Sequence, residues 1–329
     1  MELENISFFK DGGLTVWSIT VLIFIAGLIA LYFGADWLVK GASRLAISLN
    51  VQPVIVGLTV VAFGTSLPEL VVSFIGALRG LSDIALGNIV GSNIANIGLI
   101  LGLSALIFPL SVHMKLIKFE TPFMIFVAIL LFVVSINEII SRLDSILFVV
   151  VFAVYIFYTI TISKKEAKDV QKEYKEFLQG RGSLIKDSTL IIIGLAVLIL
   201  GAEMLIRSAV SIARAAGISE LIIGMTIVAV GTSLPELATS TVAALKKEAD
   251  ISIGNIVGSN IFNILFILGL TGTIQPIAVN PDAVKLHMPI MIFFSLLLFI
   301  FMGRGGILSR PRGALLLILY AAYVTSLLK

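Results

Sequence analysis

Ten long apolar runs constrain the fold of this chain more than any other feature of its sequence. A helix needs about 20 mostly apolar residues to cross the hydrocarbon core of a bilayer. The runs that meet this length span residues 15–39, 52–78, 84–107, 119–137, 142–163, 188–212, 220–245, 251–274, 285–303 and 310–328. Charged residues make up 13% of the chain, against roughly 25% in soluble domains. We therefore predict an all-α integral membrane protein with ten transmembrane helices.

A polar segment divides these runs into five and five. It spans residues 164–187 and contains seven Lys or Arg and five Asp or Glu, so we expect a solvated linker between a first unit, 1–163, and a second unit, 188–329. Of the 23 Lys and Arg residues, 16 lie on the linker side of the membrane and seven on the side of the termini. Because cytoplasmic segments carry the excess of Lys and Arg, we predict a multi-pass protein of the cell (inner) membrane with a cytoplasmic linker and both termini outside.

The two halves repeat each other at a fixed offset of 167 residues. Residues 57–98 align without a gap on 224–265, with 26 identities in 42 positions, and Gly-Thr-Ser-Leu-Pro-Glu occurs at both 64–69 and 231–236. Since each half has an odd number of predicted spans, the second copy crosses the membrane in the opposite direction. Two such copies are related by a pseudo-two-fold axis in the membrane plane. We therefore expect two inverted five-helix repeats, with a substrate site near the midplane between them.

Glu69 and Glu236 each lie near the middle of a predicted span. A carboxylate there is costly unless it binds a cation or becomes protonated. Each glutamate follows a proline, Pro68 or Pro235, whose ring removes the N–H that would bond the carbonyl four residues back. A glycine five residues before each glutamate lowers the cost of a bend. We predict a broken helix in each repeat that presents backbone oxygens beside a carboxylate, an arrangement that a membrane tolerates where they line a cavity.

Helical spacing places further oxygen atoms near each glutamate. Side chains three or four positions apart share a helix face, and the two breaks would form one site if they meet at the pseudo-two-fold axis. The predicted ligands are Glu69, Thr65, Ser66, Ser92 and Asn96 of the first repeat and Glu236, Thr232, Ser233, Ser259 and Asn263 of the second. Two structural roles stay open: the hydroxyls could bond their own helix carbonyls, and Asn88, Asn93, Asn255 and Asn260 could only bridge helices.

This set of ligands consists of oxygen atoms alone and carries two negative charges. Ca²⁺ takes about six to eight oxygen ligands in flexible geometry, whereas Mg²⁺ sheds its water reluctantly. Softer metals would need His, Cys or Met beside the glutamates, and the chain has no Cys and only two His. Two or more Na⁺ would neutralise the pair as one Ca²⁺ does. We predict an antiporter that exchanges Ca²⁺ for Na⁺, and a proton-coupled antiporter of Ca²⁺ or another divalent cation stays open.

An enzyme is not expected, because the spans contain no histidine cluster, nucleophile–base pair or aspartyl pair. The net charge of +3 is too small to indicate nucleic-acid binding. We expect no cofactor and no obligate protein partner. The expected partners are the lipid bilayer and the transported ions Ca²⁺ and Na⁺, with H⁺ as the alternative.

The paired motifs resemble the two alpha-repeats of the calcium/cation antiporter superfamily, especially those of its prokaryotic sodium/calcium exchanger branch. The likeness is carried by residues 64–96 and 231–263, and the ten-span layout extends it over nearly the whole chain. It implies a row of four cation positions between the repeats, and sliding of the first and sixth spans across the core. It implies Ca²⁺ binding by Glu69 and Glu236 with the backbone oxygens of Thr65 and Thr232, flanking Na⁺ positions completed by Ala62, Ser66, Ser92, Ala229, Ser233 and Ser259, and a middle position lined by Asn96 and Asn263.

Asn263 departs from the family pattern, because the well-described sodium/calcium exchangers usually carry Asp at this position. Here both repeats carry Asn, at 96 and 263. The pocket is therefore more symmetric and has one carboxylate fewer. This difference leaves the coupling ion and the stoichiometry open.

A second pair of acids, Asp36 and Glu203, shares the offset of 167. Each is followed four residues later by a base, Lys40 or Arg207. Acid before base at this spacing stabilises a helix. We interpret these residues as structural ion pairs.

Overall fold

The computed structural model describes residues 13–49, 51–174, 183–215, 229–303 and 305–327, and these residues are almost entirely helical. Seven of the described helices are long and apolar enough to cross a membrane. An eighth span is a pair of helices, Pro53–Thr65 and Leu67–Leu78, that is bent by 47°. The predicted α-helical membrane fold is confirmed. The count of ten stays a prediction, because much of span 220–245 lies outside the described residues and α17 (Arg310–Leu327) is not among the eight.

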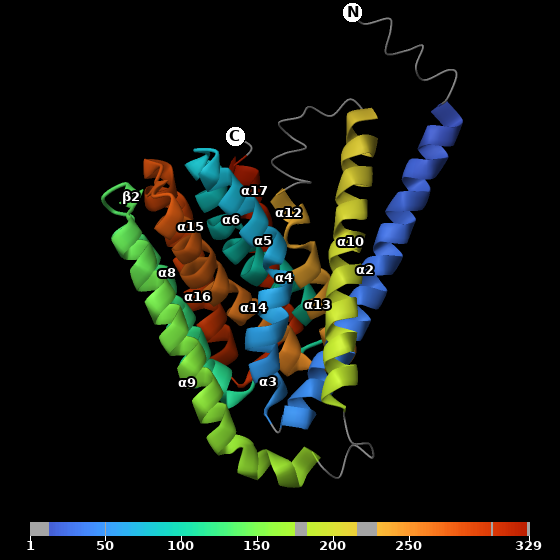
Figure 1. Cartoon of the computed structure of the whole chain (residues 1–329), viewed down its shortest axis with the longest axis vertical. Helices are drawn as coiled ribbons and strands as arrows, with labels where there is room; N and C mark the ends of the chain where they lie inside the picture. Colours follow the sequence, from blue (N-terminus) through green and yellow to red (C-terminus); the bar gives the residue numbers. More distant parts are fainter. Residues whose placement is uncertain (1–12, 50, 175–182, 216–228, 304, 328–329) are drawn as a thin grey trace, which may run out of the picture.

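The first half runs from the long α2 through the broken span to the long α9 (Figure 1). Its elements are α2 (Gly13–Leu49), α3 (Pro53–Val56), the π-helical η1 (Gly57–Val61), α4 (Ala62–Thr65), α5 (Leu67–Leu78), α6 (Ser82–Ala95), the π-helical η2 (Asn96–Leu101), α7 (Gly102–Ile107), β1 (Leu110–Ser111), the π-helical η3 (Leu116–Glu120), α8 (Thr121–Val134), β2 (Ile139–Ile140) and α9 (Arg142–Tyr174).

The second half repeats this order. Its elements are α10 (Leu184–Ala215), α12 (Ala229–Gly231), α13 (Leu234–Leu245), α14 (Ala249–Phe262), the π-helical η5 (Asn263–Leu268), α15 (Gly269–Ile274), β3 (Ile277–Ala278), the π-helical η6 (Ala283–His287), α16 (Met288–Gly303), β4 (Ile307–Leu308) and α17. Each element from α13 to α16 begins 167 residues after its counterpart in the series from α5 to α8. The structural repeat is therefore longer than the 42 aligned positions of the sequence.

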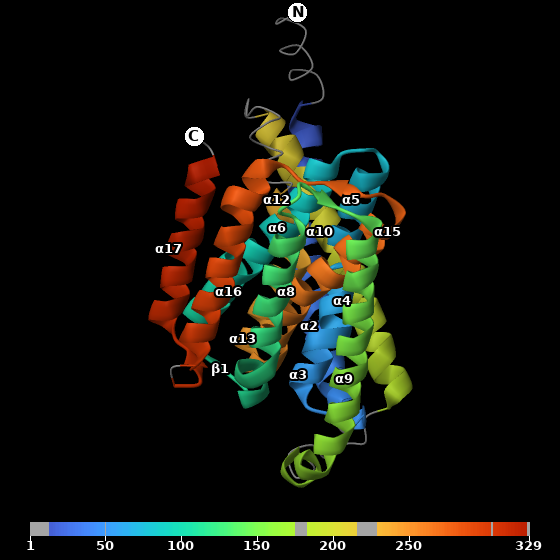
Figure 2. The ribbon, with the colours of Figure 1, turned by 90° about the vertical axis from the view of Figure 1, so that its left-hand side faces the viewer.

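Two small antiparallel sheets show that the halves are inverted. β1 pairs with β4, with Leu110 opposite Leu308, and β2 pairs with β3, with Ile140 opposite Ile277. Each sheet thus joins one strand from each half. β1 and β3 are equivalent in the repeat, yet β1 lies at the lower end of the molecule in Figure 2, whereas β2, the partner of β3, lies at the upper end in Figure 1. Equivalent strands face opposite ends, as inverted repeats require.

The central helix of each half forms the middle of the bundle. In the apolar stretch of Ala249–Ile274, 94% of the residues are buried, and in Ser82–Ile107 the share is 78%, against 22% in Ser18–Leu49. The outer spans expose large apolar side chains, such as Leu22 and Ile192. A surface of this kind is stable in lipid and not in water.

Helices α2 and α10 pack against each other as an antiparallel pair beside the other helices (Figure 1). A Cβ added at Gly34 would lie 2.6 Å from the backbone nitrogen of Leu198, and one added at Gly194 would lie 2.7 Å from that of Leu38. Glycine is needed at these positions because the two backbones approach closely, as is common between membrane helices. Helix α2 also continues beyond its predicted end at residue 39, to Leu49.

The predicted linker is helical at both of its described ends. Helix α9 continues from Arg142 to Tyr174, and α10 begins at Leu184. Residues 164–174 are rich in Lys, Glu, Ala and Gln, which favour helix, so the membrane helix extends past the boundary expected at residue 163. Residues 175–182 lie outside the described part of the chain.

Candidate cation site

Both glutamates lie in the first turn of a helix that follows a break. The break falls at Ser66 (φ −83°, ψ 8°) before α5 and at Ser233 (φ −88°, ψ 9°) before α13. The proline stands in the first turn of the new helix, where its missing N–H interrupts no hydrogen bond. The predicted break is confirmed. It brings Glu69 and Glu236 to helix N-termini, whose partial positive charge stabilises a carboxylate.

The glycines before the breaks provide room for a neighbouring helix. A Cβ added at Gly64 would lie 2.5 Å from Cδ1 of Leu195, and one at Gly231 would lie 2.7 Å from Cδ1 of Ile206. Both neighbours belong to α10. These glycines therefore allow α10 to contact both broken spans, a role beyond the easier bend that the sequence indicates.

The two breaks meet inside the molecule. Ser233 donates a hydrogen bond to Glu69 Oε1 (3.2 Å), and Ser66 donates one to Glu236 Oε1 (3.0 Å). Each of these bonds crosses from one repeat to the other. Both carboxylates are buried, with 1% and 0% of the residue surface exposed. The condition for a single site between the repeats is therefore met.

The other predicted hydroxyls join the same cluster. Ser259 donates to Glu236 Oε1 (3.5 Å), and the hydroxyls of Ser233 and Ser92 lie 3.3 Å apart, within hydrogen-bond distance. The two threonines bond across the repeats, because Thr65 donates to Asn255 Oδ1 (3.1 Å) and Thr232 donates to Asn88 Oδ1 (3.4 Å). Both threonine hydroxyls thus donate to an amide of the opposite repeat, and a cation-binding role of the threonine backbone oxygens stays a prediction.

Four buried oxygens of the predicted ligands have no hydrogen-bond donor among the described residues. They are Glu69 Oε2, Glu236 Oε2, Asn96 Oδ1 and Asn263 Oδ1. An unpaired buried acceptor costs about 1–3 kcal/mol, and a charged one costs more. All four atoms are acceptors, two come from each repeat, and two carry negative charge. A cation can satisfy such a set, and the oxygen-only chemistry fits Ca²⁺ or Na⁺ better than a soft metal.

Asn96 and Asn263 are the first residues of the π-helical segments η2 and η5. Single π-helical turns inside α-helices are frequent at functional sites. The amide nitrogens of both residues are engaged, because Asn96 Nδ2 donates to Asn260 Oδ1 (2.9 Å) and Asn263 Nδ2 donates to Asn93 Oδ1 (2.9 Å). Asn93 and Asn260 thus have the helix-bridging role that the sequence left open for them.

Asn88 and Asn255 connect the helix that carries the glutamate to the central helix of the same repeat. Asn88 Nδ2 donates to the backbone oxygen of Glu69 (3.2 Å) and to Ser73 (2.9 Å), and Asn255 Nδ2 donates to Ser240 (3.1 Å). Both asparagines therefore act as bridges. The repeat of these residues at an offset of 167 was the only sequence signal for this role.

The two alanines differ in what can be said of them. Ala62 is buried, and its backbone oxygen accepts bonds from the Ser66 nitrogen (3.1 Å) and the Thr65 hydroxyl (3.4 Å). Ala229 is the first residue of α12, and its side chain lies outside the described part of the structure. A cation-binding role of either backbone oxygen stays a prediction.

Asp36 and Glu203 form the predicted ion pairs, each within its own helix, α2 or α10. Lys40 bonds Asp36 at 2.7 Å, and Arg207 bonds Glu203 at 2.5 Å. Asp36 also forms an ion pair with Lys246, which follows α13, so this acid ties α2 to a broken span. The sequence did not indicate this third contact.

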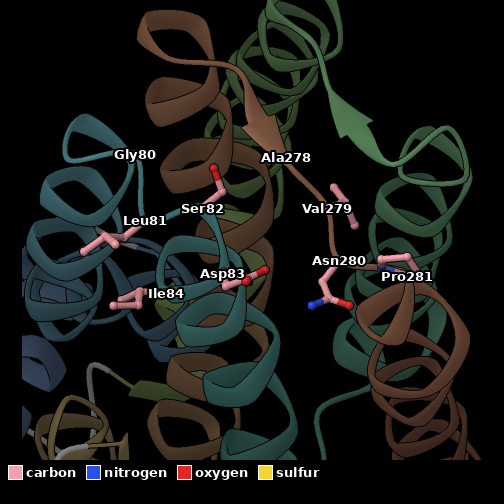
Figure 3. A pocket seen from close by; sticks show the side chains of 9 residues that line it. All are labelled: Gly80, Leu81, Ser82, Asp83, Ile84, Ala278, Val279, Asn280 and Pro281. Carbon is pink, nitrogen blue, oxygen red and sulfur yellow. The ribbon is translucent and has the colours of Figure 1, made fainter.

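A surface pocket of about 420 Å³ lies between the turn from α5 to α6 and the segment after β3 (Figure 3). Asp83 and Asn280 extend toward each other from its two walls. Its lining consists of Gly80, Leu81, Ser82, Asp83, Ile84, Ala278, Val279, Asn280 and Pro281. None of the predicted cation ligands is among these residues, so the pocket is separate from the buried cluster.

The family model described as sodium/calcium exchanger protein matches residues 19–161 and 188–329 of the chain. The putative antiporter CaxA of Alkalimonas amylolytica is 37% identical over 93% of this chain and 97% of its own length. The sodium/calcium exchanger MaX1 of Methanosarcina acetivorans is 35% identical over 94% of this chain and 99% of its own length.

The structure is similar to that of the sodium-calcium exchanger NCX_Mj soaked with 2.5 mM Na⁺ and 0.1 mM Ca²⁺. The TM-score is 0.82 at 34% sequence identity, and the alignment covers 94% of this chain and 98% of the other. A second structure of NCX_Mj, soaked without Na⁺ and Ca²⁺, gives the same TM-score of 0.82. The likeness thus extends over nearly the whole chain.

Proposed function

The chain belongs to the sodium/calcium exchanger protein family, and from this premise we propose that it exchanges Ca²⁺ for Na⁺ across a membrane by alternating access. The observation that carries the proposal is the pair of buried carboxylates, one from each inverted repeat, whose Oε2 atoms have no donor among the described residues. Two such charges in a membrane interior require positive charge to be stable. One Ca²⁺ or two or more Na⁺ would supply it, and competition for the same oxygens would couple the two fluxes.

The proposed division of ligands follows the resemblance to the exchanger family, and the meeting of the two breaks supports it. Ca²⁺ would bind between Glu69 and Glu236, with the backbone oxygens of Thr65 and Thr232. The unpaired amide oxygens of Asn96 and Asn263 would line a middle position. Na⁺ would bind beside the carboxylates, with Ser66, Ser92, Ser233 and Ser259 and the backbone oxygens of Ala62 and Ala229. This activity converts no substrate chemically and needs no cofactor.

The amide oxygens favour Na⁺ over H⁺ as the coupling ion. A proton needs only a carboxylate, whereas Na⁺ needs a cage of several oxygens. Asn96 and Asn263 add two buried amide oxygens. An amide oxygen does not take up a proton at ordinary pH, but it can bind Na⁺. Proton coupling remains the alternative, and the transport assay below separates the two.

Sliding of α2 and α10 across the other helices is the proposed motion. Their close contact through Gly34 and Gly194 supports movement of the two helices as one unit. Gly64 and Gly231 keep the broken spans close to α10. A shift of α2 and α10 would therefore change the contacts at both breaks. Such a shift could open the site to one side of the membrane and then to the other.

We place the protein in the cell membrane with the linker in the cytoplasm and both termini outside. The excess of Lys and Arg on the linker side, 16 against seven, supports this orientation. A relative 35% identical over 83% of this chain is named inner membrane protein YrbG of Escherichia coli. A cysteine introduced at Ser183 should react with a membrane-impermeant maleimide only after the cells are permeabilised, and labelling of intact cells would reverse the orientation.

The transport assay uses ⁴⁵Ca²⁺ uptake into vesicles that contain the purified protein. The vesicles are preloaded with Na⁺, K⁺ or choline at equal concentration, and an ionophore collapses the pH gradient. We expect rapid uptake with internal Na⁺ and background uptake with K⁺ or choline. Uptake that ignores internal Na⁺ but follows an imposed pH gradient would replace the sodium proposal with proton coupling.

A further inference from the structure

Asn93 and Asn260 each accept a hydrogen bond from a predicted cation ligand, Asn263 and Asn96 respectively. We propose that they are positioning residues, which hold the amides of Asn263 and Asn96 with their oxygen atoms toward the bound cation. The inference rests on the proposed function, because it assumes that a cation occupies the site between the repeats. It concerns how this chain builds a middle cation position from two asparagines.

The hydrogen-bond network fixes each amide in one orientation. Asn93 Nδ2 donates to the backbone oxygen of Asn260 (3.2 Å). A backbone carbonyl can only accept, so the Asn93 oxygen must point the other way. There it accepts from Asn263 Nδ2 (2.9 Å), which leaves Asn263 Oδ1 without a donor among the described residues. The orientation of the Asn263 amide therefore depends on that of the Asn93 amide.

The same network is formed a second time by the opposite repeat. Asn260 Nδ2 donates to the backbone oxygen of Asn93 (3.2 Å), and Asn260 Oδ1 accepts from Asn96 Nδ2 (2.9 Å). Within the described part of the chain, Asn96 Oδ1 is then left without a donor. All four residues are at most 1% exposed, so bulk water does not compete for these bonds.

The orientation matters because an amide has two different ends. Its oxygen attracts a cation, whereas its NH₂ group carries partial positive charge and repels one. A carboxylate at position 263 would present oxygen in either orientation, but an asparagine does so only when its nitrogen is engaged elsewhere. Asn93 and Asn260 supply that engagement, and they allow two neutral residues to serve as oxygen ligands on both sides of the axis.

A double-mutant cycle tests this role in the purified full-length protein. Its readouts are the Kd of ⁴⁵Ca²⁺ and the competition of that binding by Na⁺. We expect Asn263→Ala and Asn93→Ala each to raise the Kd of the same ion, Ca²⁺ or Na⁺, on the order of tenfold, the size of one lost polar contact. The double variant should be no weaker than the single ones, because Asn93 acts through Asn263. Additive losses, or no loss in Asn263→Ala, would overturn the proposal.

Asn260→Ala combined with Asn263→Ala is the matched control. Asn260 orients Asn96 and not Asn263, so these two losses should add. A second variant covers poor folding of Asn93→Ala. Asn93→Asp keeps the acceptor for Asn263 but loses the donor to the backbone of Asn260. It should bind cations more tightly than Asn93→Leu, which keeps neither contact, whereas a merely structural role predicts that the two variants are equally impaired.

The outcomes also separate this inference from the proposed function. If the unmodified protein binds neither Ca²⁺ nor Na⁺, the proposed function fails. If the unmodified protein binds both ions but the Asn93 and Asn263 effects add, only the positioning role fails.

Discussion

Replacing Glu69 with Gln removes one of the two charges of the candidate site and changes little else. The glutamine Oε1 can still accept the bond from Ser233, which spans 3.2 Å in the structure. The second oxygen, which has no donor among the described residues, becomes an NH₂ group that repels a cation. The variant therefore tests the charge and the oxygen ligand while the surrounding contacts are kept.

The expected loss of Ca²⁺ affinity follows from the charge removed. Two unit charges about 4 Å apart attract each other by about 4 kcal/mol at an effective dielectric constant of about 20. A divalent cation doubles this attraction, and the removal of water from both ions offsets part of it. We take about 4 kcal/mol as the net loss, which is about a thousandfold in Kd. A monovalent ion has half the charge, so Na⁺ binding should fall by a smaller factor.

Thermal unfolding in detergent, with and without Ca²⁺, measures this loss. For the unmodified protein, Ca²⁺ at about 100 times Kd should stabilise the fold by about 2.7 kcal/mol. The same Ca²⁺ concentration should leave Glu69→Gln unshifted. Without Ca²⁺ the variant should be at least as stable as the unmodified protein, because a neutral amide costs less to bury than a carboxylate.

Asp83→Asn serves as the control, since it removes an acid from the separate surface pocket shown in Figure 3. This variant should keep the full Ca²⁺ shift. Retention of the shift in Glu69→Gln would refute the assignment of the site to the paired glutamates. Its loss in Asp83→Asn would place the cation at the surface instead.

Three further predictions concern other parts of the molecule. Asn263→Asp should change the Na⁺ dependence or the charge moved per Ca²⁺ more than the Ca²⁺ affinity, as measured by currents across vesicle membranes. An unchanged Na⁺ dependence and an unchanged charge per Ca²⁺ would count against a role for this position in coupling. Lys246→Ala should lower the free energy of unfolding by about 1 kcal/mol, because it breaks a partly buried ion pair with Asp36. Arg79→Ala, at the equivalent position of the first repeat, should change the free energy of unfolding by less than about 0.5 kcal/mol. Equal effects of the two substitutions would argue against the ion pair. Gly34→Ala should destabilise the protein by about 1–3 kcal/mol, since its Cβ would lie 2.6 Å from a backbone atom of α10, but Gly76→Ala, whose nearest neighbour is 3.5 Å away, should be tolerated in the same melting experiment.

The parts of the fold that the sequence predicts well are those where one residue type has one physical consequence. Proline before each glutamate implies a break, and the structure has breaks at Ser66 and Ser233. The odd number of spans in each half implies inversion, which the two mixed sheets display. Helical spacing placed the serines and threonines near the glutamates, since it depends only on helix geometry.

Contacts between distant helices were harder to predict. The ion pair of Lys246 with Asp36 joins residues that are 210 positions apart, and no local pattern specifies it. The apolar run marks the membrane span of α9, Arg142–Thr161, but not the end of the helix, which continues to Tyr174 through residues that favour helix in water. The contacts of Asn93 and Asn260 also could not be predicted from the sequence, because the same residue type, asparagine, can either bridge helices or bind an ion.

The most direct test of the central claim is the position of the bound cation. Crystals of the protein soaked with Sr²⁺, a scattering substitute for Ca²⁺, can be measured at the strontium absorption edge. We predict one strong anomalous peak between Glu69 and Glu236, within coordination distance of both carboxylates. A peak in the Asp83 pocket, or no peak between the glutamates, would contradict the proposed exchange site.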